Sequence, residues 1–131
     1  MAAKAREVRS TAAPRPVGPY SQAVVIQGLV FASGQVALDP ATNALVPGEI
    51  EAQTDRVIAN LRAVLEAAGS SLDRVVRTTV YLADLGLFAR MNEVYGRHFH
   101  TEPRPARSTI QAARLPLGAA IEIDAIATLG E

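Results

Sequence analysis

Three polar residues stand where a strand or a rigid loop would more often carry an apolar side chain: Tyr20, Arg107 and Glu122. Arg107 follows Pro103-Arg104-Pro105-Ala106, and its planar guanidinium suits bidentate capture of a carboxylate. A salt bridge at a subunit interface explains Arg107 equally well. Glu122 alternates with isoleucines, so spacing alone favours a half-exposed strand residue. Tyr20 follows Gly18-Pro19, where a phenol could close a pocket or cover the core.

A glycine lies beside this set, at Ser33-Gly34, where a predicted hairpin ends. Glycine inside a strand often marks close approach of the backbone to a ligand. Together with the cation of Arg107, these positions predict an anion-binding site for a small acid.

Other chemistries are disfavoured by what the chain lacks. It has no cysteine, and none of the motifs GxxxxGK[ST], GxGxxG, GxSxG or HExxH occurs. His98 and His100 are the only histidines, and we interpret them as solvated surface residues rather than metal ligands. We therefore expect no metal site, and any catalysis must use carboxylates, hydroxyls, backbone groups or water.

Length and composition predict one globular domain over residues 1–131, because 131 residues leave no room for a second. Thirteen Lys and Arg balance thirteen Asp and Glu, which disfavours a nucleic-acid or membrane-surface partner. No apolar run approaches the roughly 18 residues of a membrane span. Residues 1–14 lack the apolar region of a secretory signal, so we expect a cytoplasmic protein with a loose N-terminus.

The elements that must position these residues follow from periodicity and from glycine and proline. A hairpin turns at Gln27-Gly28, and a helix from residue 51 ends at Gly69. A second helix is capped by Asp84 and ends before Pro103. The predicted strands are 23–26, 29–32, 75–82, 107–113 and 120–128, and the predicted helices are 51–68 and 85–99.

This order predicts an α+β fold in which two crossover helices cover one face of a sheet. The opposite face keeps apolar side chains, because apolar residues of 75–82 fall on both parities and those of 120–128 alternate with acids. No residues remain to cover that face, so we expect it to pack against another subunit.

At these same residues the sequence resembles the RidA/YjgF family of reactive-intermediate (enamine/imine) deaminases, over nearly the whole chain. The resemblance implies a chorismate-mutase-like sheet with two helices on one face, assembled as a homotrimer with sites between subunits. The segments that carry it are Gly18-Pro19-Tyr20-Ser21-Gln22, Ser33-Gly34-Gln35, Gln53-Thr54, Asn60-Leu61, Pro105-Ala106-Arg107-Ser108 and Ile121-Glu122-Ile123-Asp124-Ala125-Ile126-Ala127.

The resemblance also implies a reaction: hydrolysis of 2-iminobutanoate and 2-iminopropanoate to 2-oxo acids and ammonia, with no cofactor. Arg107 would hold the substrate carboxylate and Glu122 would position or activate the attacking water. The implied residues are Arg107, Glu122 and Tyr20 as catalytic, with Ser33, Gly34, Asn92, Arg107 and Thr109 binding substrate.

Two departures from the family pattern concern Thr109, where many members similar to this chain carry Cys, and Asp124, where Glu is commoner. Thr109 puts thiol-based regulation in doubt rather than the reaction. The alternatives are a ligand sensor or chaperone-like binder, a ribonuclease-type member, and a deaminase of aminoacrylate or 2-aminomuconate. A sensor would not need Glu122, and the balanced charge weighs against RNA.

Overall fold

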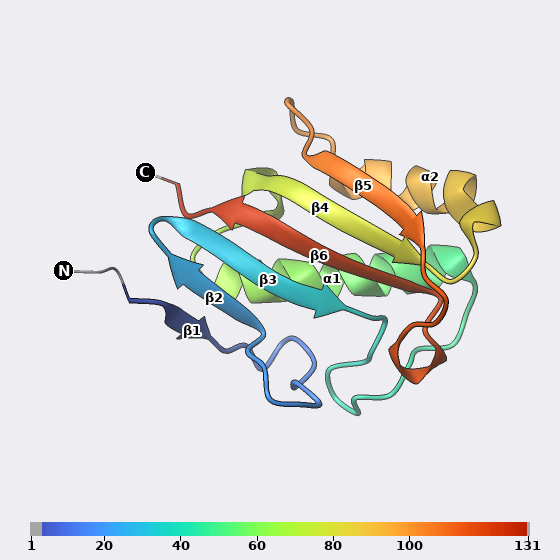
Figure 1. The fold of residues 1–131 in the computed structure, drawn as a ribbon, viewed down its shortest axis with the longest axis horizontal. Coiled ribbons are helices and arrows are strands. Elements are labelled where there is room, and N and C mark those ends of the chain that lie inside the picture. The colour runs from blue at the N-terminus through green and yellow to red at the C-terminus, as the bar shows by residue number, and fades with distance from the viewer. Residues whose placement is uncertain (1–3, 131) are drawn as a thin grey trace.

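The computed structural model of the protein describes residues 4–130, which form one mixed sheet with two helices packed on it (Figure 1). The strand order is β1-β2-β3-β6-β4-β5, and only β4 and β5 run parallel. The strands are β1 Arg6–Val8, β2 Ala23–Ile26, β3 Leu29–Gln35, β4 Val75–Leu82, β5 Ala106–Gln111 and β6 Ile121–Thr128, and the helices are α1 Ile50–Ala67 and α2 Phe88–His98.

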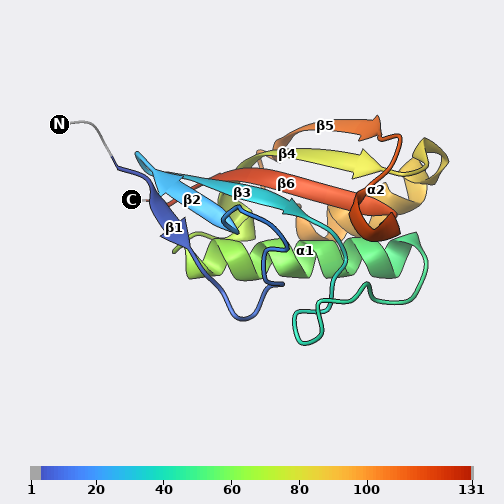
Figure 2. The same cartoon turned by 60° about the horizontal axis from the view of Figure 1, so that its bottom comes forward.

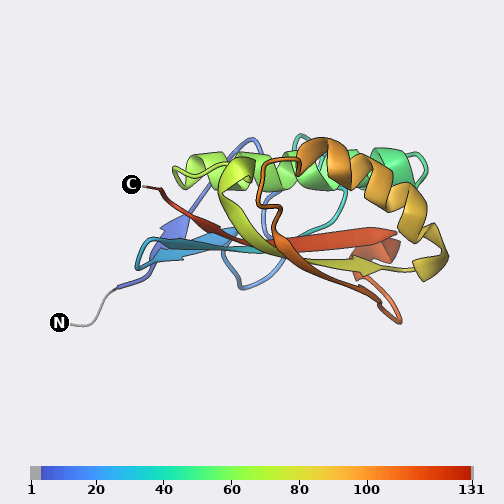
Figure 3. The same ribbon diagram turned by 90° about the horizontal axis from the view of Figure 1, so that it is seen from above.

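Both helices lie on the same face of the sheet, as expected from the sequence (Figures 2 and 3). α1 runs under the middle of the sheet and α2 covers the β4–β5 side. Helix α1 buries a stripe of apolar side chains spaced at helical intervals: Ile50, Val57, Ile58, Leu61, Val64 and Leu65. None of the helices in residues 4–130 has the length and hydropathy needed to span a bilayer.

The predicted hairpin and helix end are confirmed, and glycine determines both. Gln27 and Gly28 both have positive φ, 51° and 76°, which is the geometry of a tight I′ turn between antiparallel strands. Gly69 follows α1 at φ 90°, where its amide and that of Ser70 donate to the carbonyls of Glu66 and Leu65. This is a Schellman end, in which glycine avoids the steric penalty of left-handed backbone.

The predicted cap at Asp84 is only partly right. Its carboxylate accepts from the Gly86 amide at 2.8 Å, but it caps a short 3₁₀ turn, Leu85–Leu87, that leads into α2. Helix α2 itself begins at Phe88 with no side-chain cap. A tight turn and the first turn of a helix both favour Asp at this position, so the sequence signal does not separate them.

The N-terminus differs from the loose segment expected over residues 1–14. Arg6–Val8 pairs antiparallel with β2 as an edge strand, and Val8 is buried in the core. Residues 1–3 lie outside the described part of the chain. Three residues carry too little periodicity to indicate a strand, and β1 forms because β2 offers an unpaired backbone edge.

The second face of the sheet, opposite the helices, is the open face. The isoleucines at 121 and 123 point to the helices and are fully buried, so they do not supply its apolar residues as the sequence analysis had assigned. Glu122, Asp124 and Ile126 of β6 lie there instead, half-buried. Exposed Phe31 is paired with Ile126 and exposed Ile110 with Tyr81, which places apolar surface on this face. Packing against another subunit stays a prediction.

Candidate functional site

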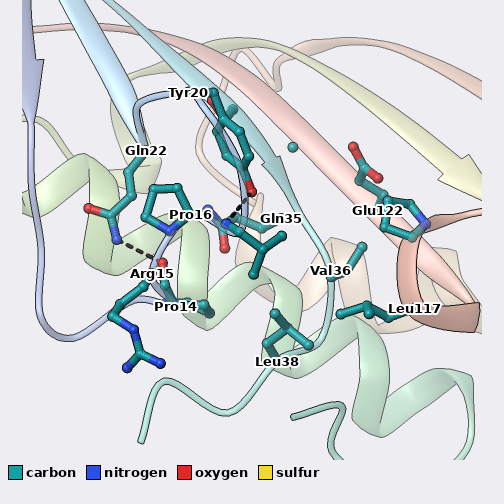
Figure 4. A pocket seen from close by; sticks show the side chains of 14 residues that line it. Pro14, Arg15, Pro16, Tyr20, Gln22, Gln35, Val36, Leu38, Leu117 and Glu122 are labelled. Carbon is teal, nitrogen blue, oxygen red and sulfur yellow. Dashed lines mark hydrogen bonds between the residues drawn. The ribbon is translucent and has the colours of Figure 1, made fainter. Parts of the chain in front are cut away.

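A cavity of about 340 Å³ opens where the proline-rich loop of residues 14–20, the end of β3 and the start of β6 meet (Figure 4). It brings together four of the residues predicted from the sequence: Tyr20, Ser33, Gly34 and Glu122. Leu117, from the turn before β6, adds an apolar wall. The cavity is thus a concave pocket with a single acidic side chain, which is the usual form of a small-ligand site.

Gln22 fixes the proline-rich loop that carries Tyr20. Its side-chain amide donates to the carbonyls of Ser10 and Pro14 at 3.0 and 2.9 Å, and its carbonyl accepts from the Ser10 amide at 2.7 Å. Gln22 is 5% exposed, so these bonds satisfy a buried amide. The Tyr20 hydroxyl accepts from the Val17 amide at 3.3 Å within the same loop. The role of Gln22 does not follow from local pattern, and its place in the Gly18–Gln22 segment that carries the family resemblance is the one signal in the sequence.

Asn60 fixes the opposite wall of the cavity from helix α1. It is fully buried, and its side-chain amide donates to the carbonyls of Val36 and Leu38 at 3.2 and 2.9 Å. Both of these residues line the cavity. A rigid helix therefore holds the irregular segment after β3 in place, which is the support that a binding loop needs.

Ser33 shapes the cavity wall at an irregularity in the pairing of β3 with β6. Its hydroxyl donates to the Ser21 carbonyl at 2.6 Å and its amide donates to the Gln22 carbonyl at 2.9 Å. Because both of its donors are engaged, Ser33 positions the strand end rather than offering a free hydrogen bond to a ligand.

Gly34 is required by the position of the Glu122 carboxyl. A Cβ atom at residue 34 would lie 2.0 Å from Glu122 Oε2 and 2.8 Å from Glu122 Cδ. Real Cβ atoms do not approach other atoms so closely, so only glycine lets this carboxyl lie against the β3 backbone. The glycine inside the predicted strand thus marks a close approach, here by a side chain of the same molecule.

Glu122 is half-buried on the open face of β6, and it lines the cavity with its carboxyl against the backbone of Gly34 (Figure 4). Burial raises the pKa of this carboxyl, and the negative charge of Asp124 raises it further. A carboxyl with a raised pKa in a cleft is suited to exchange protons with a bound molecule and a water.

Arg107 lies elsewhere, on the helix-covered face. It is paired with Thr78 of β4, and its guanidinium stacks on the ring of Tyr95 with its carbon 4.6 Å from the centroid. The Phe88 ring lies 5.6 Å away. None of the ion pairs within residues 4–130 involves Arg107, so its charge is held by aromatic faces and is available to an anion.

Asn92 and Thr109 belong with Arg107 rather than with the cavity. Thr109 is two residues beyond Arg107 on β5 and therefore shares its face. Asn92 lies on α2 at helical spacing from Phe88 and Tyr95, and its Oδ1 is buried with no hydrogen-bond partner in residues 4–130. The predicted site residues thus form two groups: the Glu122 cavity, and an Arg107 group that lies under α2.

The two histidines differ from each other. His98 links the helices, because its Nε2 lies 2.8 Å from Asp55 Oδ1 and its Nδ1 lies 3.4 Å from an Arg62 nitrogen. Its interpretation as a solvated surface residue is only partly right: the side chain is 21% exposed, but α1 supplies partners that the local sequence does not show. His100 is exposed. Residues 4–130 contain no group of three or more His, Asp or Glu arranged to hold a metal ion.

Comparisons with known proteins place this geometry in context. Residues 10–129 match the family model described as endoribonuclease L-PSP. Protein DfrA of Myxococcus xanthus is 54% identical over 129 residues, which cover 97% of this chain and 96% of DfrA. A mouse protein named 2-iminobutanoate/2-iminopropanoate deaminase is 44% identical over 123 residues, 94% of this chain and 90% of the mouse protein. The crystal structure of a putative endoribonuclease from Thermotoga maritima has a TM-score of 0.92 at 49% identity, covering 96% of this chain and 98% of its own.

Proposed function

Because the chain belongs to the YjgF/RidA family, whose model carries the description endoribonuclease L-PSP, we propose that it is an imine deaminase. The proposed substrates are small 2-imino acids, 2-iminobutanoate and 2-iminopropanoate, with 2-oxo acids and ammonia as products. The name of the mouse relative supports this substrate class.

The observation that supports the proposal most directly is the Glu122 carboxyl. It lies half-buried against Gly34 in a cavity of about 340 Å³, and its pKa is raised by burial. That volume suits a small acid better than a polymer. The ionised form of this carboxyl can take a proton from water and later return it.

The chemistry requires little beyond this group. The carbon of a protonated imine is already electrophilic, so a water oriented by Glu122 adds to it while its proton passes to the carboxyl. The proton then goes to the nitrogen, the C–N bond breaks, ammonia leaves, and a second proton is lost from oxygen to give the 2-oxo acid. One imine and one water are consumed, so the reaction needs neither a metal nor a cofactor.

Arg107 supplies the carboxylate-binding cation in this proposal, although a single chain holds it on the other side of the sheet from Glu122. A homotrimer with sites between subunits reconciles the two groups, because Arg107 of one subunit can then face the Glu122 cavity of the next. Exposed Phe31 and Ile110 on the open face favour such packing.

We expect the purified protein to be a trimer in solution. Light scattering coupled to gel filtration should give a mass of three times 13.8 kDa, because the open face leaves apolar side chains exposed in one chain. A stable monomer would contradict both the trimer and a site that spans subunits.

A substitution of Gly34 should reduce activity without unfolding the protein. In Gly34→Ala the new Cβ displaces the Glu122 carboxyl, and a displacement of this size is expected to reduce kcat/KM by about tenfold to a hundredfold. Gly96→Ala is the matched control, because a Cβ at residue 96 meets no atom within 4 Å. Equal activity of the two variants would show that the carboxyl position does not matter.

The proposal as a whole is tested by a coupled assay. A threonine or serine dehydratase generates the imine in situ, and the appearance of the 2-oxo acid is followed with and without this protein. An accelerated release that depends on protein concentration supports the proposal. No acceleration, together with cleavage of RNA or binding of the imino acid without turnover, would favour the alternatives. The cytoplasmic location stays a prediction from the sequence.

A further inference from the structure

Asp124 is the most firmly held acidic side chain near the cavity. Its Oδ2 accepts from the Tyr81 hydroxyl at 3.1 Å, and its Oδ1 accepts from the Thr79 backbone amide at 3.2 Å. Both partners lie on β4, the neighbouring strand, and Asp124 is half-buried. Hydrogen bonds to both oxygens fix the orientation of this carboxylate.

Glu122 lies two residues before Asp124 on the same face of the same strand, so their backbones are about 6.6 Å apart. Tyr81 is paired directly opposite Glu122 in the sheet. Its hydroxyl nevertheless reaches diagonally to Asp124, and no hydrogen bond within residues 4–130 engages the Glu122 carboxyl. The two acids therefore differ in kind: Asp124 is fixed by donors, whereas Glu122 is free to exchange a proton.

The other groups that face Glu122 do not offset the negative charge of Asp124. The end of β3 contributes only Ser33, Gly34 and Gln35, which carry no charge. From β4 the facing titratable group is Tyr81, and from the proline-rich loop they are Tyr20 and Arg15. The Arg15 guanidinium points away from Glu122 (Figure 4). Asp124 is thus the charged group that acts on the Glu122 carboxyl, together with burial.

We propose that Asp124, anchored by Tyr81 and Thr79, is a positioning residue whose fixed negative charge increases the affinity of the Glu122 carboxylate for a proton. The purpose of this arrangement rests on the proposed function, because an ionised carboxylate with a higher proton affinity is a stronger base toward water in the first step of imine hydrolysis. In the second step, Glu122 returns that proton to the departing nitrogen. Asp124 itself touches no reacting atom.

The test measures the protonation of Glu122 directly, so that it does not depend on activity. Glutamate carboxyl carbons are labelled with ¹³C, the Glu122 signal is assigned with Glu122→Gln, and its titration is followed by NMR. In Asp124→Asn, which removes the charge and keeps the shape, the midpoint should fall by roughly half a pH unit or more. Asp124→Glu, which restores the charge, should return the midpoint toward the parental one.

Controls separate a local effect from a general one. Glu66→Gln removes the same charge from an exposed position on α1 and should leave the Glu122 midpoint unchanged. If Asp124→Asn does not fold, Asp124→Ser removes the charge with a smaller side chain that can still accept from the Thr79 amide. A Glu122 midpoint that stays the same or rises after loss of the Asp124 charge overturns the inference.

The kinetic readout then links the pair to the reaction. In Asp124→Asn, the acidic limb of the kcat/KM profile should move to lower pH with the Glu122 midpoint, and Asp124→Glu should reverse the movement. If the midpoint shifts but the parental protein does not hydrolyse imines, the proposed function fails while the tuning of Glu122 stands. If imines are hydrolysed and the midpoint does not shift, only the tuning fails.

Discussion

Replacing Glu122 with glutamine is expected to lower kcat/KM for imine hydrolysis by about 100-fold to 10,000-fold. Glutamine keeps the shape of the side chain that lies against Gly34 but can neither accept nor return a proton at this position. The loss should appear in kcat, because substrate binding is assigned to the Arg107 group. Steady-state kinetics with imine generated in situ measures both parameters.

The matched control for this variant is Glu66→Gln, which makes the same chemical change on the exposed surface of α1. It should retain parental kinetics. Because burial raises the pKa of Glu122, its ionised form strains the folded state, and Glu122→Gln should be at least as stable as the parent at neutral pH. Parental activity in Glu122→Gln would show that this carboxyl takes no part in the reaction, and it would favour a binding function for the protein.

The elements of the fold were predictable where local chemistry is strong. The I′ turn at Gln27-Gly28 and the helix end at Gly69 follow from glycine in left-handed backbone, and the helices follow from their apolar spacing. The alternation along β6 predicts that Glu122 points away from Ile121 and Ile123, but it does not predict which of the two sides faces the helices. Arg6–Val8 was not predictable, since an edge strand of three residues depends on the partner strand.

The separation of Arg107 from Glu122 could not be predicted from the sequence. Strand β5 has no fully buried residue, so its pattern does not indicate which side of the strand faces the helices. The face of Arg107 is decided by its pairing with Thr78 and by the aromatic rings of α2, which are contacts distant in sequence. The hydrogen bond of Tyr81 could not be predicted either, because its hydroxyl donates to Asp124 and not to Glu122, the residue directly opposite.

Replacing Arg107 with alanine is expected to lower kcat/KM by roughly a hundredfold or more, because a charge-assisted bidentate contact to a carboxylate is lost in a desolvated cleft. Arg107→Lys should recover only part of the activity, since a point charge does not reproduce the planar fork or its stacking on Tyr95. Arg97→Ala, which removes an exposed arginine from α2, is the matched control and should be unaffected.

A structural role for Arg107 predicts a different result. If it forms a salt bridge between subunits, Arg107→Ala should lose its oligomeric state or much of its thermal stability together with its activity. Light scattering and thermal unfolding on the preparation used for kinetics distinguish the two roles. A variant that keeps the parental assembly and turns over imine at the parental rate would show that Arg107 is outside the site.

The two groups can also be tested against each other in one experiment. Arg107→Ala subunits retain Glu122, and Glu122→Gln subunits retain Arg107. A site shared between neighbours is therefore intact wherever an Arg107→Ala subunit supplies Glu122 and the adjacent Glu122→Gln subunit supplies Arg107. Random mixing in a trimer with three such sites should restore about a quarter of parental activity from two nearly inactive variants. The measurement is made after unfolding and refolding the variants together, with each refolded alone as the control. A mixture no more active than its components would mean that Arg107 and Glu122 do not meet across a subunit boundary.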